Sequence, residues 1–173
     1  MMVNILKVVL ILFFFTTFSA KAEKIVIVDI NALITNSKAG QSIKIKLKEE
    51  KDLLTKQFKS KEDDLKSQEK KLISQKNVLS EEEFKKKIQE HREKISKHNA
   101  EKKNKLESLN QKKAKGVSNL LKNLNDILVV YSKDNDIELI VDKKYTILTK
   151  NEKDITKKVL LLLDEKISKV SFN

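Results

Sequence analysis

The chain has 173 residues and a formal net charge of +12, with 36% charged and 39% apolar residues. It contains no cysteine, no proline, no tryptophan and only two glycines. Without cysteine there is no disulfide framework, thiolate metal site or cysteine nucleophile, and two glycines cannot form a G-x-x-x-x-G-K-[ST] or G-x-G-x-x-G phosphate loop. The lack of proline, which would break helical hydrogen bonding, favours long helices, and the length fits one domain.

The first 22 residues have the features of a secretory signal peptide. A lysine precedes the largely apolar residues 8–18, and residues 20–22 (Ala-Lys-Ala) fit the A-x-A cleavage pattern. The apolar stretch is shorter than the roughly 20 residues that span a bilayer, so a membrane anchor is the less favoured alternative. Cleavage after Ala22 would leave an exported, cysteine-free chain of residues 23–173.

The two ends of this exported chain predict a small α+β body. Residues 24–30 form a β-branched run typical of a buried strand, and residues 137–142 form a second one. Residues 145–148 are predicted as a third strand. Asp154 is expected to be the N-cap of a closing amphipathic helix over residues 155–167.

The middle of the chain predicts a long helical hairpin, with helices over residues 41–76 and 81–133. Apolar residues in the first helix recur mostly at seven-residue steps, namely Leu47, Leu54, Phe58, Leu65, Leu72 and Leu79. Residues 80–83 (Ser-Glu-Glu-Glu) form a capping box that starts the second helix. At ~1.5 Å per residue the two helices would be roughly 54 and 80 Å long, so the hairpin should project far beyond the body.

The predicted seam between the two helices becomes polar toward the hairpin corner. Its expected inward polar residues are Lys61, Gln68, Gln75, His91, His98 and Lys102. Apolar residues are instead dense over residues 117–131, close to the body. Because polar seam residues weaken helix pairing, the tip should be mobile and the base firm. The body alone is too small for a stable core, which favours oligomerisation.

Excess positive charge is confined to the hairpin. Residues 41–133 contain 25 Lys or Arg and 15 Asp or Glu, a net charge of +10, whereas residues 23–40 and 134–173 together contain ten of each. The candidate residues for attracting an anionic partner are Arg92, Lys94, Lys97, Lys102, Lys103, Lys105, Lys112, Lys113 and Lys115. Although charge runs are often only solvated faces, several such hairpins on one body would add their fields in the space between them.

The chain resembles the Skp/OmpH family of periplasmic chaperones, and the resemblance covers essentially residues 23–173. It is most specific at residues 136–142 (Asp-Ile-Glu-Leu-Ile-Val-Asp) and at residues 154–160, where Asp-Ile-Thr precedes Val-Leu. The resemblance implies a homotrimer whose arms, residues 41–133, surround a cavity that holds unfolded outer-membrane β-barrel proteins without ATP. It also implies an oligomerisation body of residues 23–40 and 134–173. Residues expected in its strands are Ile25, Ile27, Leu139 and Val141.

Other functions fit the sequence less well. A structural envelope coiled coil would need a continuous apolar seam, and a nucleic-acid binder would need interleaved aromatic residues and a location near nucleic acid. Binding of anionic lipid or lipopolysaccharide remains an alternative, although the arms lack a broad apolar face. His91 and His98 are roughly 10 Å apart along one helix, too far to share a metal ion, and are predicted to be polar seam residues. Asp29 and Asp142 follow strands and are predicted to be turn formers and not a catalytic pair. Because the sequence shows no nucleophile beside a base and no cluster of metal ligands, we predict no enzyme activity and no cofactor.

Overall fold

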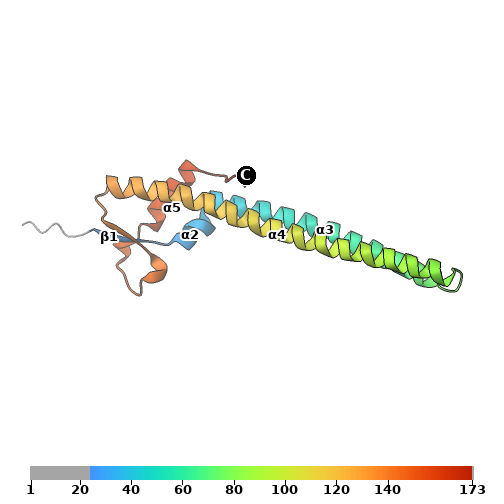
Figure 1. Cartoon of the computed structure of the whole chain (residues 1–173). Helices are drawn as coiled ribbons and strands as arrows, with labels where there is room; N and C mark the ends of the chain where they lie inside the picture. The colour runs from blue at the N-terminus through green and yellow to red at the C-terminus, as the bar shows by residue number, and fades with distance from the viewer. Residues whose placement is uncertain (1–23, 173) are drawn as a thin grey trace, which may run out of the picture.

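The computed structural model describes residues 24–172, so the predicted signal peptide and its cleavage position lie outside the described residues. A small body at one end carries a long antiparallel pair of helices that projects away from it (Figure 1). This confirms the predicted α+β class with a helical hairpin arm. None of the helices within residues 24–172 is long and apolar enough to cross a bilayer.

The body contains two parallel strands that are far apart in the sequence. Strand β1 (Ile25–Val28) pairs with β2 (Leu139–Asp142), and Ile25 lies opposite Leu139. Parallel strands need a long crossover connection, and here the whole hairpin is that connection. On its other side β1 has a single bridge, from Ile27 to Asp154, while the second edge of β2 has no strand partner among residues 24–172.

A short helix that was not predicted, α2 (Ile30–Asn36), follows β1 directly. The Asp29 side chain accepts a 2.8 Å hydrogen bond from a backbone N–H in the first turn of α2, so the predicted strand over residues 24–30 ends early. The next helix packs so closely against α2 that a Cβ at Gly40 would lie 1.7 Å from the Ile34 carbonyl oxygen. Glycine is therefore required at this corner.

The arm consists of α3 (Lys38–Ser74) and α4 (Glu81–Asp134), about 56 and 81 Å long at ~1.5 Å per residue. The predicted capping box is present, because the Glu83 backbone N–H donates to Ser80 Oγ and the Ser80 N–H donates back to the Glu83 carboxylate. The hairpin prediction is therefore confirmed, with α3 starting three residues before the expected position.

The segment after β2 differs from the prediction. It contains two short 3-10 helices, η1 (Lys143–Tyr145) and η2 (Asn151–Lys153), and no strand over residues 145–148. The third-strand prediction is wrong for the single chain because the Thr146 N–H bonds locally, to the Lys143 carbonyl oxygen, and no neighbouring strand offers it a partner.

The closing helix α5 (Thr156–Lys166) is present, but Ile155 and not Asp154 occupies its N-cap position. The Asp154 carboxylate still accepts a 2.9 Å hydrogen bond from the Thr156 N–H. Asp154 thus stabilises the entry to α5 from one position upstream.

The body and the base of the arm share one hydrophobic core. Its most deeply buried large side chains come from β1, α2, α4 and α5, and each is at most 2% exposed: Val28, Leu33, Leu120, Leu124, Val159 and Leu163. The small strand pair is therefore not stabilised alone, since the arm helices complete its core.

Candidate functional site

Beyond the base, the seam between α3 and α4 contains few buried apolar side chains. Phe58 and Leu65 of α3 are buried there, and His91 and His98 of α4 are buried with them. The prediction that both histidines are polar seam residues is confirmed. This part of the arm is therefore held together by a mixed polar and apolar seam.

Two other predicted seam residues do not point inward. Lys61 and Gln75 are exposed, because long polar side chains at a narrow seam extend to water. Gln68 and Lys102 are half-buried and stay near the seam. The outer seam is consequently narrower than the heptad pattern predicts.

The two buried histidines differ in their hydrogen bonding. His91 Nε2 lies 2.9 Å from the Leu65 carbonyl oxygen, and since a carbonyl only accepts, this nitrogen donates. The His98 ring packs edge-on against Phe58, with ring centroids 5.8 Å apart. Its buried Nε2 lies 3.6 Å from Glu62 Oε1, beyond hydrogen-bonding distance. His98 is therefore a buried polar group with an unmet hydrogen bond.

Cross-helix ion pairs flank this seam. Lys102 Nζ of α4 lies 2.7 Å from Glu62 Oε1 of α3, and Lys112 Nζ lies 2.5 Å from Glu50 Oε1. The hydrogen bond and charge of Lys102 lower the pKa of Glu62. These two lysines serve the pairing of the arm helices as well as its surface charge.

The nine basic residues predicted to attract a partner lie along α4 over residues 92–115, about 35 Å of helix. Besides the paired Lys102 and Lys112, Lys94 donates to the Gln68 side chain. The other six are exposed and form no ion pair among the described residues: Arg92, Lys97, Lys103, Lys105, Lys113 and Lys115. Of the nine predicted residues, these six and Lys94 are exposed basic residues without an ion pair among the described residues.

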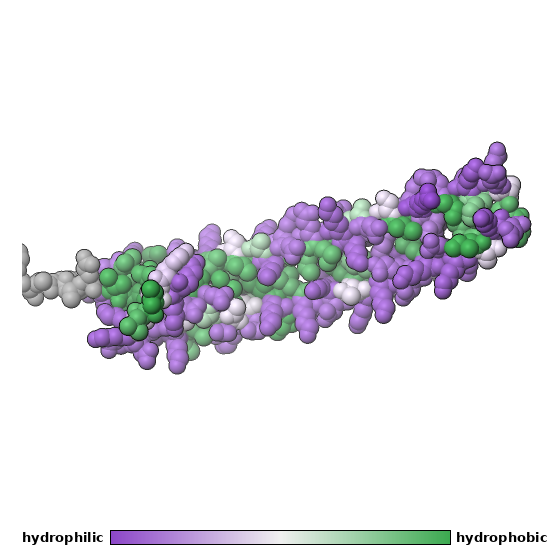
Figure 2. All heavy atoms as spheres, turned by 90° about the horizontal axis from the view of Figure 1, so that it is seen from below, coloured by the Kyte–Doolittle hydropathy of each residue, from purple (hydrophilic) through white to green (hydrophobic). Residues whose placement is uncertain are grey.

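Apolar side chains are also exposed along the arm, which the sequence analysis did not identify individually. They are 38 to 83% exposed and comprise Ile45, Leu53, Ile73, Val78, Leu106, Leu121, Val129 and Val130. Figure 2 shows apolar surface at the body, at the arm tip and in patches between them, surrounded by hydrophilic side chains. The arm thus presents scattered apolar contacts in a cationic setting.

The body has its own exposed apolar surface. Among the four predicted oligomerisation residues, Ile25 and Leu139 are 40% and 51% exposed, Val141 is half-buried, and Ile27 is buried. The loop after β2 adds three more exposed side chains: Tyr145, Ile147 and Leu148. Strand β2 also has an edge without a strand partner among residues 24–172, and exposed apolar side chains and free strand edges both suit association with another chain.

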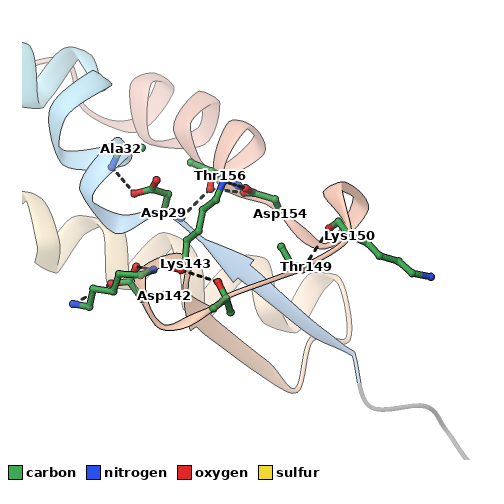
Figure 3. Close-up of polar contacts among 10 residues, drawn as sticks. Asp29, Ala32, Asp142, Lys143, Thr149, Lys150, Asp154 and Thr156 are labelled. Carbon is green, nitrogen blue, oxygen red and sulfur yellow. Dashed lines mark hydrogen bonds and ion pairs between the residues drawn. The ribbon is translucent and has the colours of Figure 1, made fainter.

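A polar cluster at the carboxyl ends of the strands joins the body segments (Figure 3). The Asp29 backbone N–H donates to Thr156 Oγ1 at 2.8 Å, and Lys143 Nζ lies 2.8 Å from Asp154 Oδ2. Burial would raise the pKa of Asp154, but hydrogen bonds from Lys143 and Thr156 outweigh it and lower that pKa. Asp29 caps α2 and Asp142 accepts from the Lys144 N–H, so both act as the predicted turn formers.

The comparisons with known proteins agree with this architecture. The family model for outer membrane protein (OmpH-like) matches residues 24–163. A crystal structure of an OmpH-like protein from Caulobacter crescentus CB15, assigned as an outer membrane chaperone, is similar with a TM-score of 0.82. The two sequences are 16% identical, and the match covers 91% of this chain and 93% of the other. No curated protein sequence gives a match.

A helical-hairpin protein with a small strand-containing body is the class that the fold defines. Because the family model matches most of the chain, the chain belongs to the OmpH-like family. That family comprises chaperones and not enzymes, and OmpH-like outer membrane chaperones are periplasmic.

Proposed function

We propose that this chain is an ATP-independent periplasmic holdase that binds unfolded outer-membrane β-barrel proteins and prevents their aggregation. The observation that carries the proposal is the surface of the arm, which presents both exposed basic residues and scattered exposed apolar ones. Unfolded barrel strands alternate apolar and polar side chains, so their captor needs many weak contacts without fixed register. Lysines supply long-range attraction and the apolar side chains supply short-range contact.

The proposal includes a homotrimer whose bodies associate and whose arms enclose a shared cavity. Support comes from the exposed apolar surface around Ile25, Leu139 and the 145–148 loop, together with the unpaired edge of β2. Three tethered arms raise the effective concentration of each further contact, so weak individual contacts suffice. The proposed oligomerisation body is residues 23–40 and 134–173, and the proposed arm is residues 41–133.

Export with cleavage after Ala22 belongs to the same proposal and rests on the signal-peptide pattern. The two glycines of the chain, which cannot form a phosphate loop, support activity without a nucleotide. Release would then follow from folding of the client into a membrane.

The test compares two sets of lysine substitutions. Changing Lys103, Lys105, Lys113 and Lys115 to Gln removes exposed charges that form no ion pair among the described residues, so capture of a denatured barrel protein should slow about tenfold at low salt. Stopped-flow fluorescence of a labelled client diluted from urea would measure capture, and light scattering would measure aggregation.

The matched control is Lys102→Gln with Lys112→Gln, which removes two charges that are already paired with Glu62 and Glu50. It should slow capture less per charge removed. Unchanged capture by the fourfold variant at low salt would contradict the electrostatic part of the proposal. If anionic vesicles or lipopolysaccharide bind while a denatured barrel protein does not, the lipid-binding alternative is correct.

A further inference from the structure

Residues 167–172, here called the strap, follow α5 and lie against the base of the arm (Figure 1). They fall outside residues 24–163, which the family model matches. Val170 is 6% exposed and belongs to the shared core, and Phe172 packs against that core. The strap is therefore packed against the core, and it has no role yet in either the capture surface of the arm or the assembly surface of the body.

The Phe172 ring occupies a notch between the two arm helices. A Cβ at Gly116 of α4 would lie 2.8 Å from Cε1 of this ring and 3.4 Å from Cδ1 of Ile43 in α3. Glycine inside a helix costs roughly 1 kcal/mol relative to alanine, and at Gly116 it leaves room for a flat ring. The notch therefore has the shape of an aromatic subsite.

Two polar groups complete the seat of the strap. Lys46 Nζ lies 5.5 Å from the centroid of the Phe172 ring, within the range of a cation–π interaction. Asn119 Nδ2 donates a 3.0 Å hydrogen bond to the Ser171 carbonyl oxygen. Among the contacts of the seat are thus a ring and the preceding backbone carbonyl, two groups that any non-helical segment with an aromatic residue can offer.

The notch also lies where a client would pass. Gly116 directly follows Lys115, the last residue of the basic stretch 92–115. A segment drawn along the arm by that charge reaches the notch at the body end of the stretch. Aromatic residues form girdles at both ends of the apolar band of outer-membrane barrels, so clients of the proposed function carry suitable side chains.

We propose that this notch binds an aromatic side chain of an extended client segment, and that Phe172 occupies it as an intramolecular placeholder. The proposal rests on the proposed holdase function. Because the strap is tethered, it competes at high effective concentration, so a client must offer aromatic residues to displace it. The strap thereby favours barrel-like clients over generally apolar chains.

The first test uses fluorescent hexapeptides with the sequence of residues 167–172, carrying either Phe or Ala at the sixth position. In Phe172→Ala the emptied notch should bind the Phe peptide about tenfold more tightly than the unchanged chain does, and the Ala peptide should bind weakly to both. Adding Gly116→Leu to Phe172→Ala should abolish the gain by filling the notch. Equal affinity of Phe172→Ala and the unchanged chain, or no effect of Gly116→Leu, would overturn the proposal.

A second measurement needs no substitution at the site. Incorporating 4-fluorophenylalanine into residues 23–173 labels Phe58, Phe84 and Phe172 only, so ¹⁹F NMR can follow the strap directly. A denatured barrel protein should move the Phe172 resonance to its solvent-exposed position, and a client whose aromatic residues are all changed to Leu should not. If the chemical shift of Phe172 does not change while the barrel protein is bound, the strap has only a structural role and the proposal is wrong.

These experiments separate the two proposals. If the barrel protein is held but Phe172 is never displaced, the holdase function stands and the aromatic subsite is wrong. If Phe172→Ala binds the Phe peptide but no chain holds a barrel protein, the notch is an aromatic peptide site and its assignment to such clients is wrong.

Discussion

The same two helices meet in different ways at the base and along the outer arm. At the base, Leu120 and Leu124 are 0% and 2% exposed within a core that also includes α2 and α5. Farther out, the contacts are Phe58 and Leu65 with the two buried histidines, His91 and His98. Since polar seam residues weaken helix pairing, the base should hold the arm in place while the outer part opens more readily.

The exposed apolar residues of the body suit subunit association, whereas those of the arm suit contact with a client. In the body these residues belong to the strand pair and the loop after it, and β2 has an edge without a strand partner among residues 24–172. Both features suit a permanent partner. Along the arm they are dispersed among lysines, which suits many weak contacts. In the proposed function, the body therefore mediates assembly and the arm mediates client capture.

The largest effect is expected from Leu139→Asp, which tests the body side of this comparison. Leu139 is 51% exposed in the single chain, so the substitution should leave the fold intact. It should nevertheless abolish the proposed trimer, because a charge would be buried without a partner at the interface. Sedimentation velocity would measure the mass.

The control is Leu53→Asp on the arm, where the side chain is similarly exposed at 57%. It should leave the assembly unchanged. A Leu139→Asp chain that still sediments as a trimer would place the subunit interface elsewhere.

Leu120→Ala and Phe58→Ala compare the two parts of the arm directly. Leu120→Ala creates a cavity in the shared core and should lower the free energy of unfolding by about 3 kcal/mol. Phe58→Ala should barely change global unfolding but should speed amide hydrogen exchange in the outer arm. Urea denaturation and hydrogen-exchange mass spectrometry would measure both effects. An equal loss of global stability would show that base and outer arm unfold as one unit.

Much of this comparison can be predicted from the sequence. The heptads, the fading seam and the capping box at residues 80–83 gave the correct hairpin, because those signals are local and periodic. Helix α2 was not predicted, since its β-branched residues continue the pattern of β1 and only the Asp29 side-chain cap ends the strand.

Other features depend on the register between distant segments. Lys102 and Lys112 are paired with Glu62 and Glu50 only because α3 and α4 align in one way. Gly116 lies inside α4, and only the packing of Phe172 against it accounts for a glycine at this position. A glycine within an otherwise strong helical pattern was the available signal for the notch.

His98→Leu and His91→Leu should change the stability of the outer arm by different amounts, because the two histidines differ in hydrogen bonding. Leucine at position 98 removes a buried nitrogen that has no hydrogen-bond partner within residues 24–172, so the arm should become about 1 kcal/mol more stable. Leucine at position 91 removes the hydrogen bond to the Leu65 carbonyl and should stabilise the arm less or destabilise it. Hydrogen exchange of the outer arm would measure both changes. The same gain from both variants would mean that the His91 hydrogen bond contributes nothing.

The smallest expected effect is on the pH dependence of stability. It is tested at two carboxylate–lysine pairs, one in the body and one in the arm. The pKa of Asp154 is lowered below its ordinary value of 3.8, and that of Glu62 below 4.5. A carboxylate with a lowered pKa in the folded state contributes stability above its unfolded pKa, and this contribution is lost as the pH falls through the folded value. Asp154→Asn should therefore be less stable than the unchanged chain at pH 7, and the difference should shrink below about pH 4.

Glu62→Gln should show the same sign, but in the exchange of the outer arm and not in global unfolding. The Glu62–Lys102 pair is partly exposed, with side chains 39% and 42% accessible, and solvent-exposed pairs contribute little. The Asp154 carboxylate is less exposed and also accepts from the Thr156 N–H, so its loss should lower the melting temperature of the body measurably. Melting curves of both variants at pH 7 and pH 3 would measure the effect on global unfolding. Hydrogen exchange at the same two pH values would measure the effect on the outer arm. A pH-independent deficit in Asp154→Asn would mean that shape, and not ionisation, makes Asp154 stabilise the body.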